Sequence, residues 1–150
     1  MNIIEALKKH NYTIATAESL TAGLISSKIA NISGASNHLK GGVCSYTKEA
    51  KCNLLGINME NINKYGVYSE YTAISMARGI KEKLDSNVAI ATTGVAGPGS
   101  DENVEAGVVY FGFIINDLEI TECISFNGDR NEVRDKAAEY AVKKIIELLV

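Results

Sequence analysis

The most informative feature of this sequence is a pair of small-residue stretches. Each stretch directly follows a run of apolar and β-branched residues. They are residues 16–23 (TAESLTAG) and residues 92–99 (TTGVAGPG). Both are typical of turns that follow a strand, where small side chains and glycines let a ligand come close to backbone amides and hydroxyls. We therefore expect the functional site to lie at these two turns.

Strand and helix patterns alternate along the rest of the chain. Asn116-Asp117 is a two-residue connection suited to a hairpin, so the last two strands should be antiparallel. The alternation predicts an α/β fold of one domain over residues 1–150, a three-layer α/β/α arrangement around a mixed sheet with a C-terminal antiparallel hairpin. The expected strands are 12–16, 41–46, 87–92, 107–115 and 118–126; the expected helices are 2–10, one carrying Leu24, Ile25 and Ile29, 48–55, a short turn at 59–65, 70–84, and one from Asp129 nearly to Val150.

Capping residues support several of these helices. Thr47 is placed to cap the helix of 48–55, and Asp129 with Glu132 has the spacing of a capping box. For the helix that follows the first small-residue stretch, we expect Ser19 or Thr21 to be the cap.

Charge and composition exclude several classes of function. The net charge is −3, the isoelectric point is near 5.4 and the basic residues are scattered, so the electrostatic footprint of a nucleic-acid-binding protein is missing. The sequence shows no signal-peptide pattern and no apolar run of membrane-spanning length, so we expect a cytoplasmic protein without a membrane partner. Cys44, Cys52 and Cys123 are odd in number and lack C-x-x-C spacing, which disfavours disulfides and structural zinc and favours reduced core thiols.

Common catalytic motifs are absent from the chain. There is no P-loop, no G-x-G-x-x-G after the first strand and no G-x-S-x-G elbow. Only His10 and His38 could supply an imidazole base, and His10 closes an amphipathic helix, where a surface position suits it. A Ser-His-Asp triad is therefore not favoured.

A hydroxyl activated by an amine remains as the candidate for acyl chemistry. Ser19 lies at a strand-to-helix turn whose amides could stabilise an oxyanion, and Lys51 lies near the positive end of the helix capped by Thr47. That position should lower the pKa of the amine and make it a base near neutral pH. From spacing alone the plainer interpretation, a helix-capping serine and a solvated lysine, is favoured.

Arg130 and Arg134 form a second candidate cluster. They lie four residues apart, on one face at the start of the last helix, and with free amides there they could bind a phosphate or carboxylate. Pairing with Asp129, Glu132 or Asp135 explains them equally well.

The chain resembles the CinA C-terminal domain family over nearly its whole length. The resemblance lies in the order and spacing of many separated blocks, far more specific than any single motif. These blocks are residues 17–23 (AESLTAG), 41–46 (GGVCSY), 49–51 (EAK), 55–56 (LG), 66–69 (GVYS), 76–79 (MARG), 93–98 (TGVAGP) and 128–130 (GDR) through Val133-Arg134.

The resemblance implies nicotinamide mononucleotide deamidase activity, the hydrolysis of the carboxamide to nicotinate mononucleotide and ammonia, without metal or cofactor. It implies Ser19 as nucleophile and Lys51 as base, with Tyr46 and Thr93 close by. It further implies a small-molecule nucleotide partner and a homo-oligomer, for which we expect a dimer. The residues expected to bind the substrate are Thr21, Gly23, Gly42, Gly94, Ala96, Gly97, Arg130 and Arg134.

Plainer roles remain open for the supporting residues. Tyr46 could cover the sheet edge, Thr93 could satisfy loop amides, and Glu18 could steer Lys51 or simply be solvated.

The chain departs from the family pattern at two places. Ala22 replaces a glycine after the serine, and Glu105 stands where relatives carry a Lys-Pro-Val-Gly segment, which reverses a charge beside the second glycine-rich loop. Two alternatives follow: a non-catalytic module that binds a nucleotide for regulation, or an amidohydrolase of another small carboxamide. These 150 residues hold no counterpart of the large N-terminal domain of full-length CinA proteins, so we expect the stand-alone deamidase form.

Overall fold

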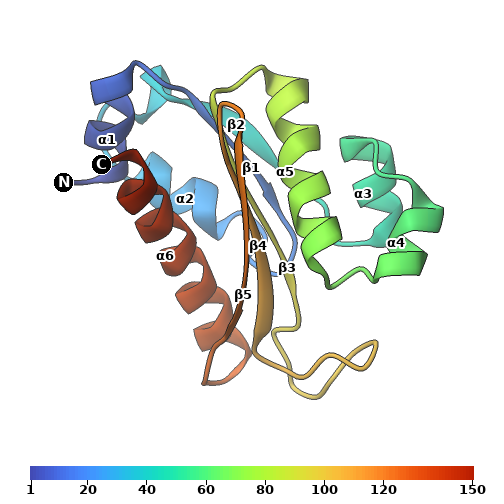
Figure 1. Cartoon of the computed structure of the whole chain (residues 1–150). Helices are drawn as coiled ribbons and strands as arrows, with labels where there is room; N and C mark the ends of the chain where they lie inside the picture. Colours follow the sequence, from blue (N-terminus) through green and yellow to red (C-terminus); the bar gives the residue numbers. More distant parts are fainter.

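A single five-stranded mixed sheet forms the centre of the molecule. The computed structural model describes all 150 residues. The strands run in the order β2-β1-β3-β4-β5, with β1, β2 and β3 parallel and with β4 and β5 forming an antiparallel hairpin beside β3 (Figure 1). This confirms the predicted fold class. The strand bounds are β1 Ile14–Glu18, β2 Leu39–Cys44, β3 Val88–Gly94, β4 Val108–Ile115 and β5 Leu118–Ser125.

Helices cover both faces of this sheet (Figure 1). One face carries α1 (Ile3–His10), α2 (Leu24–Ala30) and the long α6 (Arg130–Leu149). The other carries α5 (Glu70–Leu84), with α3 (Lys48–Leu55) and α4 (Met59–Tyr65) packed beyond it; a 3₁₀ turn at Ala35–Asn37 precedes β2. Each face encloses its own apolar cluster, one built around α6 and one around α5.

The two central parallel strands are buried along their whole length. Alternate residues of β1 contribute to opposite layers: Ile14 packs in the α6 cluster, whereas Ala15 and Ala17 pack in the α5 cluster. Small residues let α5 approach the sheet closely, since a Cβ on Gly112 would lie 2.5 Å from the carbonyl oxygen of Ala73. Burial of this kind stabilises the fold by roughly 25 cal/mol for each Å² of apolar surface removed from water.

The chain order places a ligand site at the end of β1. From β1 the chain crosses to β2 through α2 on one face, and from β2 it crosses to β3 through α5 on the opposite face. The connections that follow β1 and β2 therefore leave the sheet on opposite faces, and open α/β sheets bind ligands where the connections change face in this way. The two small-residue stretches begin within β1 and β3 and extend past the carboxyl ends of these strands.

The predicted helices are all present, and most strand bounds are within two residues of the expected ones. Thr47 and Asp129 cap their helices as expected, and Asp129 and Glu132 form the full capping box. The cap expected for α2 was wrong: neither Ser19 nor Thr21 fills that role, and Gly23 occupies the N-cap position with φ of 97° and no capping side chain.

Glu18 performs the capping of α2 instead. Its carboxylate accepts hydrogen bonds from the amides of Ile25 (2.9 Å) and Ser26 (3.1 Å) and from the Ser26 hydroxyl (3.1 Å). A negative charge at a helix N-terminus is favourable because the free amides and the helix dipole both point toward it. Glu18 is only 1% exposed. The alternative that Glu18 is simply solvated is therefore wrong.

The expectation that all three cysteines are core thiols was also wrong. All three are free, but Cys44 and Cys123 are exposed and Cys52 is half-buried. The exposed pair belongs to the two edge strands β2 and β5, where one side of the strand has no neighbour. No helix of the structure has both the length and the apolar character needed to cross a lipid bilayer.

Candidate active site

Ser19 and Lys51 meet at the carboxyl end of β1. The Nζ of Lys51 donates to the hydroxyl of Ser19 at 3.1 Å and to the backbone carbonyl of Ser45 at 2.7 Å. Both side chains are buried, with Lys51 only 1% and Ser19 5% exposed. The amide of Ser19 donates to the carbonyl of Thr92 at 3.1 Å, which fixes the turn against β3. The plainer interpretation of a solvated lysine therefore does not hold.

Local structure explains why Lys51 points inward. Thr47 starts α3 by accepting from the amide of Ala50 at 3.1 Å, and Lys51 follows one turn later on the side that faces the end of the sheet. The Ser45 carbonyl then receives one N–H of the amine, so the position of the nitrogen is fixed by the backbone just after β2.

Burial lowers the pKa of Lys51 from its ordinary value of 10.5 to about 8, with the opposing influence of nearby Cys52 smaller. The direction agrees with the sequence argument, but the leading cause is desolvation of the ammonium rather than the helix dipole. A pKa of about 8 leaves roughly a tenth of the amines neutral at pH 7. In the neutral form the nitrogen can accept the Ser19 hydroxyl proton while still donating to Ser45.

Ser19 lines a cavity of about 180 Å³. Its walls come from the Ser19 turn, the residues after β2, the second glycine-rich loop and the start of α6. The lining residues are Ser19, Leu20, Tyr46, Tyr68, residues 94–101 and Arg130. Of the residues expected from the sequence, Ser19, Tyr46, Gly94, Ala96, Gly97 and Arg130 line this cavity.

Backbone amides are available in these walls. The amides of Leu20, Ala96 and Gly97 donate to no acceptor within the protein. Free N–H groups beside a buried nucleophile can stabilise an oxyanion or bind a phosphate. The second small-residue stretch thus presents backbone donors, in the manner that its composition predicts.

The two arginines of α6 have separate surroundings. Arg130 lines the cavity, where its guanidinium donates to the Gly97 carbonyl and, at 2.8 Å, to the hydroxyl of Tyr46. Arg134 lies outside the lining, and its Nε donates to the carbonyl of Leu20 at 2.8 Å. Arg130 can therefore meet a ligand directly, whereas Arg134 holds the backbone that follows Ser19.

Four other predicted residues lie behind the cavity wall. The hydroxyls of Thr21 and Thr92 are 2.9 Å apart, and Thr93 donates to the Val67 carbonyl at 2.9 Å. Gly23 begins α2, and Gly42 lies in β2 against Thr16, where a Cβ would come within 2.1 Å of the Thr16 hydroxyl. Thr21, Thr93, Gly23 and Gly42 thus shape the turn and the sheet and are not among the lining residues.

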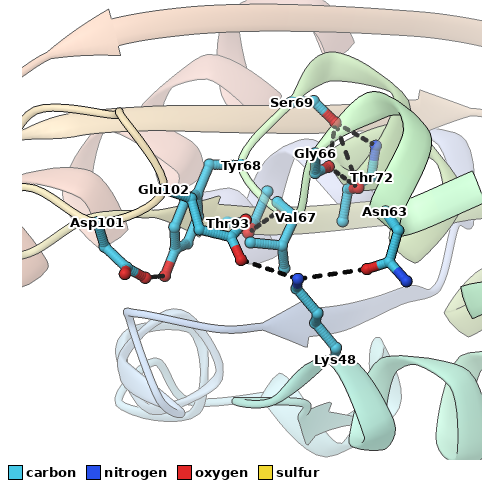
Figure 2. A network of polar contacts seen from close by, with 10 residues as sticks. All are labelled: Lys48, Asn63, Gly66, Val67, Tyr68, Ser69, Thr72, Thr93, Asp101 and Glu102. Carbon is cyan, nitrogen blue, oxygen red and sulfur yellow. Dashed lines mark hydrogen bonds and ion pairs between the residues drawn. The ribbon is translucent and has the colours of Figure 1, made fainter.

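Sequence reasoning missed two residues of the lining, Tyr68 and Asp101. The Tyr68 hydroxyl donates to Asp101 at 2.6 Å. Figure 2 shows this pair of residues. Burial and this hydrogen bond raise the pKa of Tyr68 well above its usual range, so the phenol remains a donor. The only signal available was the block 66–69; nothing in the sequence joined it to residue 101. Glu105, which the sequence analysis singled out for its charge, is exposed and does not line the cavity.

Comparison with known proteins identifies the class to which this fold and site belong. The family model of the CinA C-terminal domain matches residues 1–149, so the chain belongs to the CinA C-terminal domain family. It is 39% identical over 141 residues to a CinA-like protein of Kosmotoga olearia and 36% identical over 150 residues to one of Petrotoga mobilis. These matches cover 93% and 99% of the chain but 34% and 37% of the relatives, so the chain spans about a third of their length.

Solved structures share the whole architecture. A crystal structure of competence damage-inducible protein A from Klebsiella pneumoniae matches with a TM-score of 0.93 and 29% identity, covering 99% of this chain and 98% of that one. A CinA superfamily protein from Escherichia coli matches with a TM-score of 0.93 and 30% identity, over 96% of this chain and 84% of that one.

Proposed function

We propose that this domain hydrolyses the carboxamide of nicotinamide mononucleotide to nicotinate mononucleotide and ammonia by a Ser-Lys mechanism. The observation that carries the proposal is the 3.1 Å contact between the Lys51 amine and the Ser19 hydroxyl beside a cavity. Membership of the CinA C-terminal domain family supports the choice of substrate, since the family resemblance implies this activity.

The first half of the reaction forms an acyl-enzyme. Neutral Lys51 takes the proton of Ser19 as its oxygen bonds to the carboxamide carbon, and the carbonyl oxygen becomes an oxyanion. The free amides of Leu20, Ala96 and Gly97 line the cavity and can donate hydrogen bonds to that charge. The carbon–nitrogen bond then breaks, and the Lys51 ammonium returns its proton to the departing amine, which leaves as ammonia.

The second half releases the product. Water attacks the acyl carbon, Lys51 accepts a proton from it, and the ester bond to Ser19 breaks as Lys51 gives that proton to the serine oxygen. The carboxylic acid that forms ionises in water. Arg130 and the amides of the glycine-rich loop supply the donors for the nucleotide phosphate.

Ammonia release from nicotinamide mononucleotide tests the proposal. We expect turnover by the wild type and a loss of at least about a thousandfold in Ser19→Ala and Lys51→Ala, because each removes a group that reacts. Ser27→Ala and Lys143→Ala change exposed residues of the same types and should leave turnover unchanged. Wild-type turnover by Ser19→Ala would overturn the mechanism. Tight nucleotide binding by a wild type that releases no ammonia would favour the non-catalytic alternative, and release from other carboxamides alone would change the substrate.

A further inference from the structure

The cavity carries charges of both signs. Arg130 and Asp101 both line it. The guanidinium bonds to Gly97 and Tyr46, while the only hydrogen bond to the Asp101 carboxylate comes from the neutral Tyr68 hydroxyl. No lysine, arginine or histidine pairs with Asp101, so its negative charge is uncompensated by the protein.

Two tyrosines share the cavity lining with this carboxylate, and one of them, Tyr68, bonds to it. Tyr68 is half-buried and Tyr46 is exposed at the cavity, and both line it together with Asp101. The faces of aromatic rings carry partial negative charge and attract cations. A carboxylate with two tyrosines is therefore an environment that favours a delocalised organic cation over a neutral ring.

An ion pair next to Asp101 in the chain holds the segment that carries it. Glu102 forms an ion pair with Lys48 at 2.8 Å, and the same amine donates to Asn63 at 3.3 Å. Figure 2 shows these contacts together with the Tyr68–Asp101 hydrogen bond. Because Lys48 belongs to α3, the carboxylate is positioned relative to the same helix that carries Lys51.

We propose that Asp101, with Tyr68 beside it, selects the positively charged pyridinium ring of the substrate while Arg130 binds the phosphate. The inference rests on the proposed function and narrows its substrate class to zwitterionic pyridinium nucleotides, in preference to neutral aromatic carboxamides. It also gives the carboxylate a role at the end of the reaction. The product bears a new carboxylate on the same ring, which weakens its attraction to Asp101 relative to the substrate.

Binding to the Ser19→Ala protein tests this inference without requiring turnover. Calorimetry would compare nicotinamide mononucleotide with benzamide riboside 5′-phosphate, in which carbon replaces the ring nitrogen and the ring is neutral. We expect the cationic ligand to bind about five- to tenfold tighter at low salt, and this ratio to fall to about one in Ser19→Ala/Asp101→Asn, because Asn retains an acceptor for Tyr68 but no charge. Ser19→Ala/Glu105→Gln removes a charge outside the cavity lining and should keep the ratio.

Three results would overturn the inference. An equal loss of affinity for both ligands in Asp101→Asn would show that the carboxylate contacts the ribose hydroxyls instead. A ratio unaffected by the substitution would show that the carboxylate does not sense the ring. A failure of both ligands to bind at millimolar concentration would show that the cavity is not a nucleotide site. If the wild type releases no ammonia but the affinity ratio of the two ligands still depends on Asp101, only the proposed hydrolysis is rejected.

Discussion

The amine of Lys51 lies 3.1 Å from the hydroxyl of Ser19, although 32 positions separate the two residues in the chain. The sheet produces this contact. Glu18 and Cys44 are register partners at the ends of β1 and β2, so the residues after each strand emerge side by side. The helix that follows β2 then returns Lys51 to the end of β1 within its first turn. Strand register, a property of the backbone, thus determines the distance between the two reactive groups.

Activity should rise with pH through the titration of Lys51. The neutral amine is the base, and its pKa is about 8 in the folded protein. We expect kcat/KM to increase about tenfold per pH unit below pH 8 and to level off above it. Ammonia release between pH 5.5 and 9.5 measures the profile, and Lys51→Arg, which stays charged, should be inactive throughout. A flat profile would be incompatible with an amine base.

Lys51 should also make the stability of the protein depend on pH. Because its pKa is lowered in the folded state, the unfolded chain binds more protons between about pH 8 and 10.5, and stability contributed by this residue rises with pH in that window. Lys51→Met removes the dependence. We expect the free energy of unfolding of Lys51→Met minus that of the wild type to be about 3 kcal/mol larger at pH 7 than at pH 10.5, because each unit of the pKa shift is worth about 1.4 kcal/mol. Urea unfolding at both pH values measures it, and equal differences would contradict the prediction.

Substitutions of Arg130 and Arg134 should have different effects, the first on substrate binding and the second on catalytic rate. Arg130→Ala removes a guanidinium that lines the cavity, and we expect KM for nicotinamide mononucleotide to rise about tenfold or more, with little change for the riboside that lacks phosphate. Arg134→Ala frees the Leu20 carbonyl, so we expect kcat to fall about tenfold for both substrates. Steady-state kinetics with the two substrates distinguish the effects. A phosphate-dependent KM change in Arg134→Ala would reverse the assignment.

Glu18 should be a strong contributor to stability. Its buried carboxylate receives three hydrogen bonds at the start of α2, and Glu18→Gln replaces the charge and one acceptor oxygen. We expect a loss of about 2 kcal/mol in the free energy of unfolding, measured by urea denaturation. Glu139→Gln, on the exposed side of α6, is the matched control and should change stability by no more than about 0.5 kcal/mol. Equal effects of the two substitutions would show that the cap is unimportant.

Gly42 should tolerate no side chain, for steric reasons alone. A Cβ would lie 2.1 Å from the hydroxyl and 2.7 Å from the carbonyl oxygen of Thr16 on the neighbouring strand. We expect Gly42→Ala to lower the free energy of unfolding by about 3 kcal/mol. Gly56→Ala, with φ of 69° and open space around the added methyl, should cost only about 1 kcal/mol. Thermal or urea unfolding ranks the two, and a milder effect at Gly42 would contradict the close packing.

Much of the fold follows from local sequence signals. Helix-capping at Thr47 and Asp129, and the hairpin at Asn116-Asp117, each act within a few residues, so pattern and spacing predict them. The capping role of Glu18 was harder to predict. The chain must reverse direction after β1 before the Glu18 carboxylate meets the amides of α2.

The site was predictable where a single turn carries the chemistry and not where two distant segments meet. The small residues of 94–97 and the turn of Ser19 both line the cavity, as their composition indicated. The Tyr68–Asp101 contact joins two loops 33 positions apart and depends on how each loop is supported. No local pattern contains that information.

The final helix α6 joins the candidate site to the core of the molecule. At its start, Arg130 donates to the carbonyl of Gly97 and Arg134 donates to the carbonyl of Leu20, so one helix contacts both loops that line the cavity. The buried side of the same helix packs in the apolar cluster on one face of the sheet. Packing of α6 in the core therefore keeps the two loops in a fixed relation to each other.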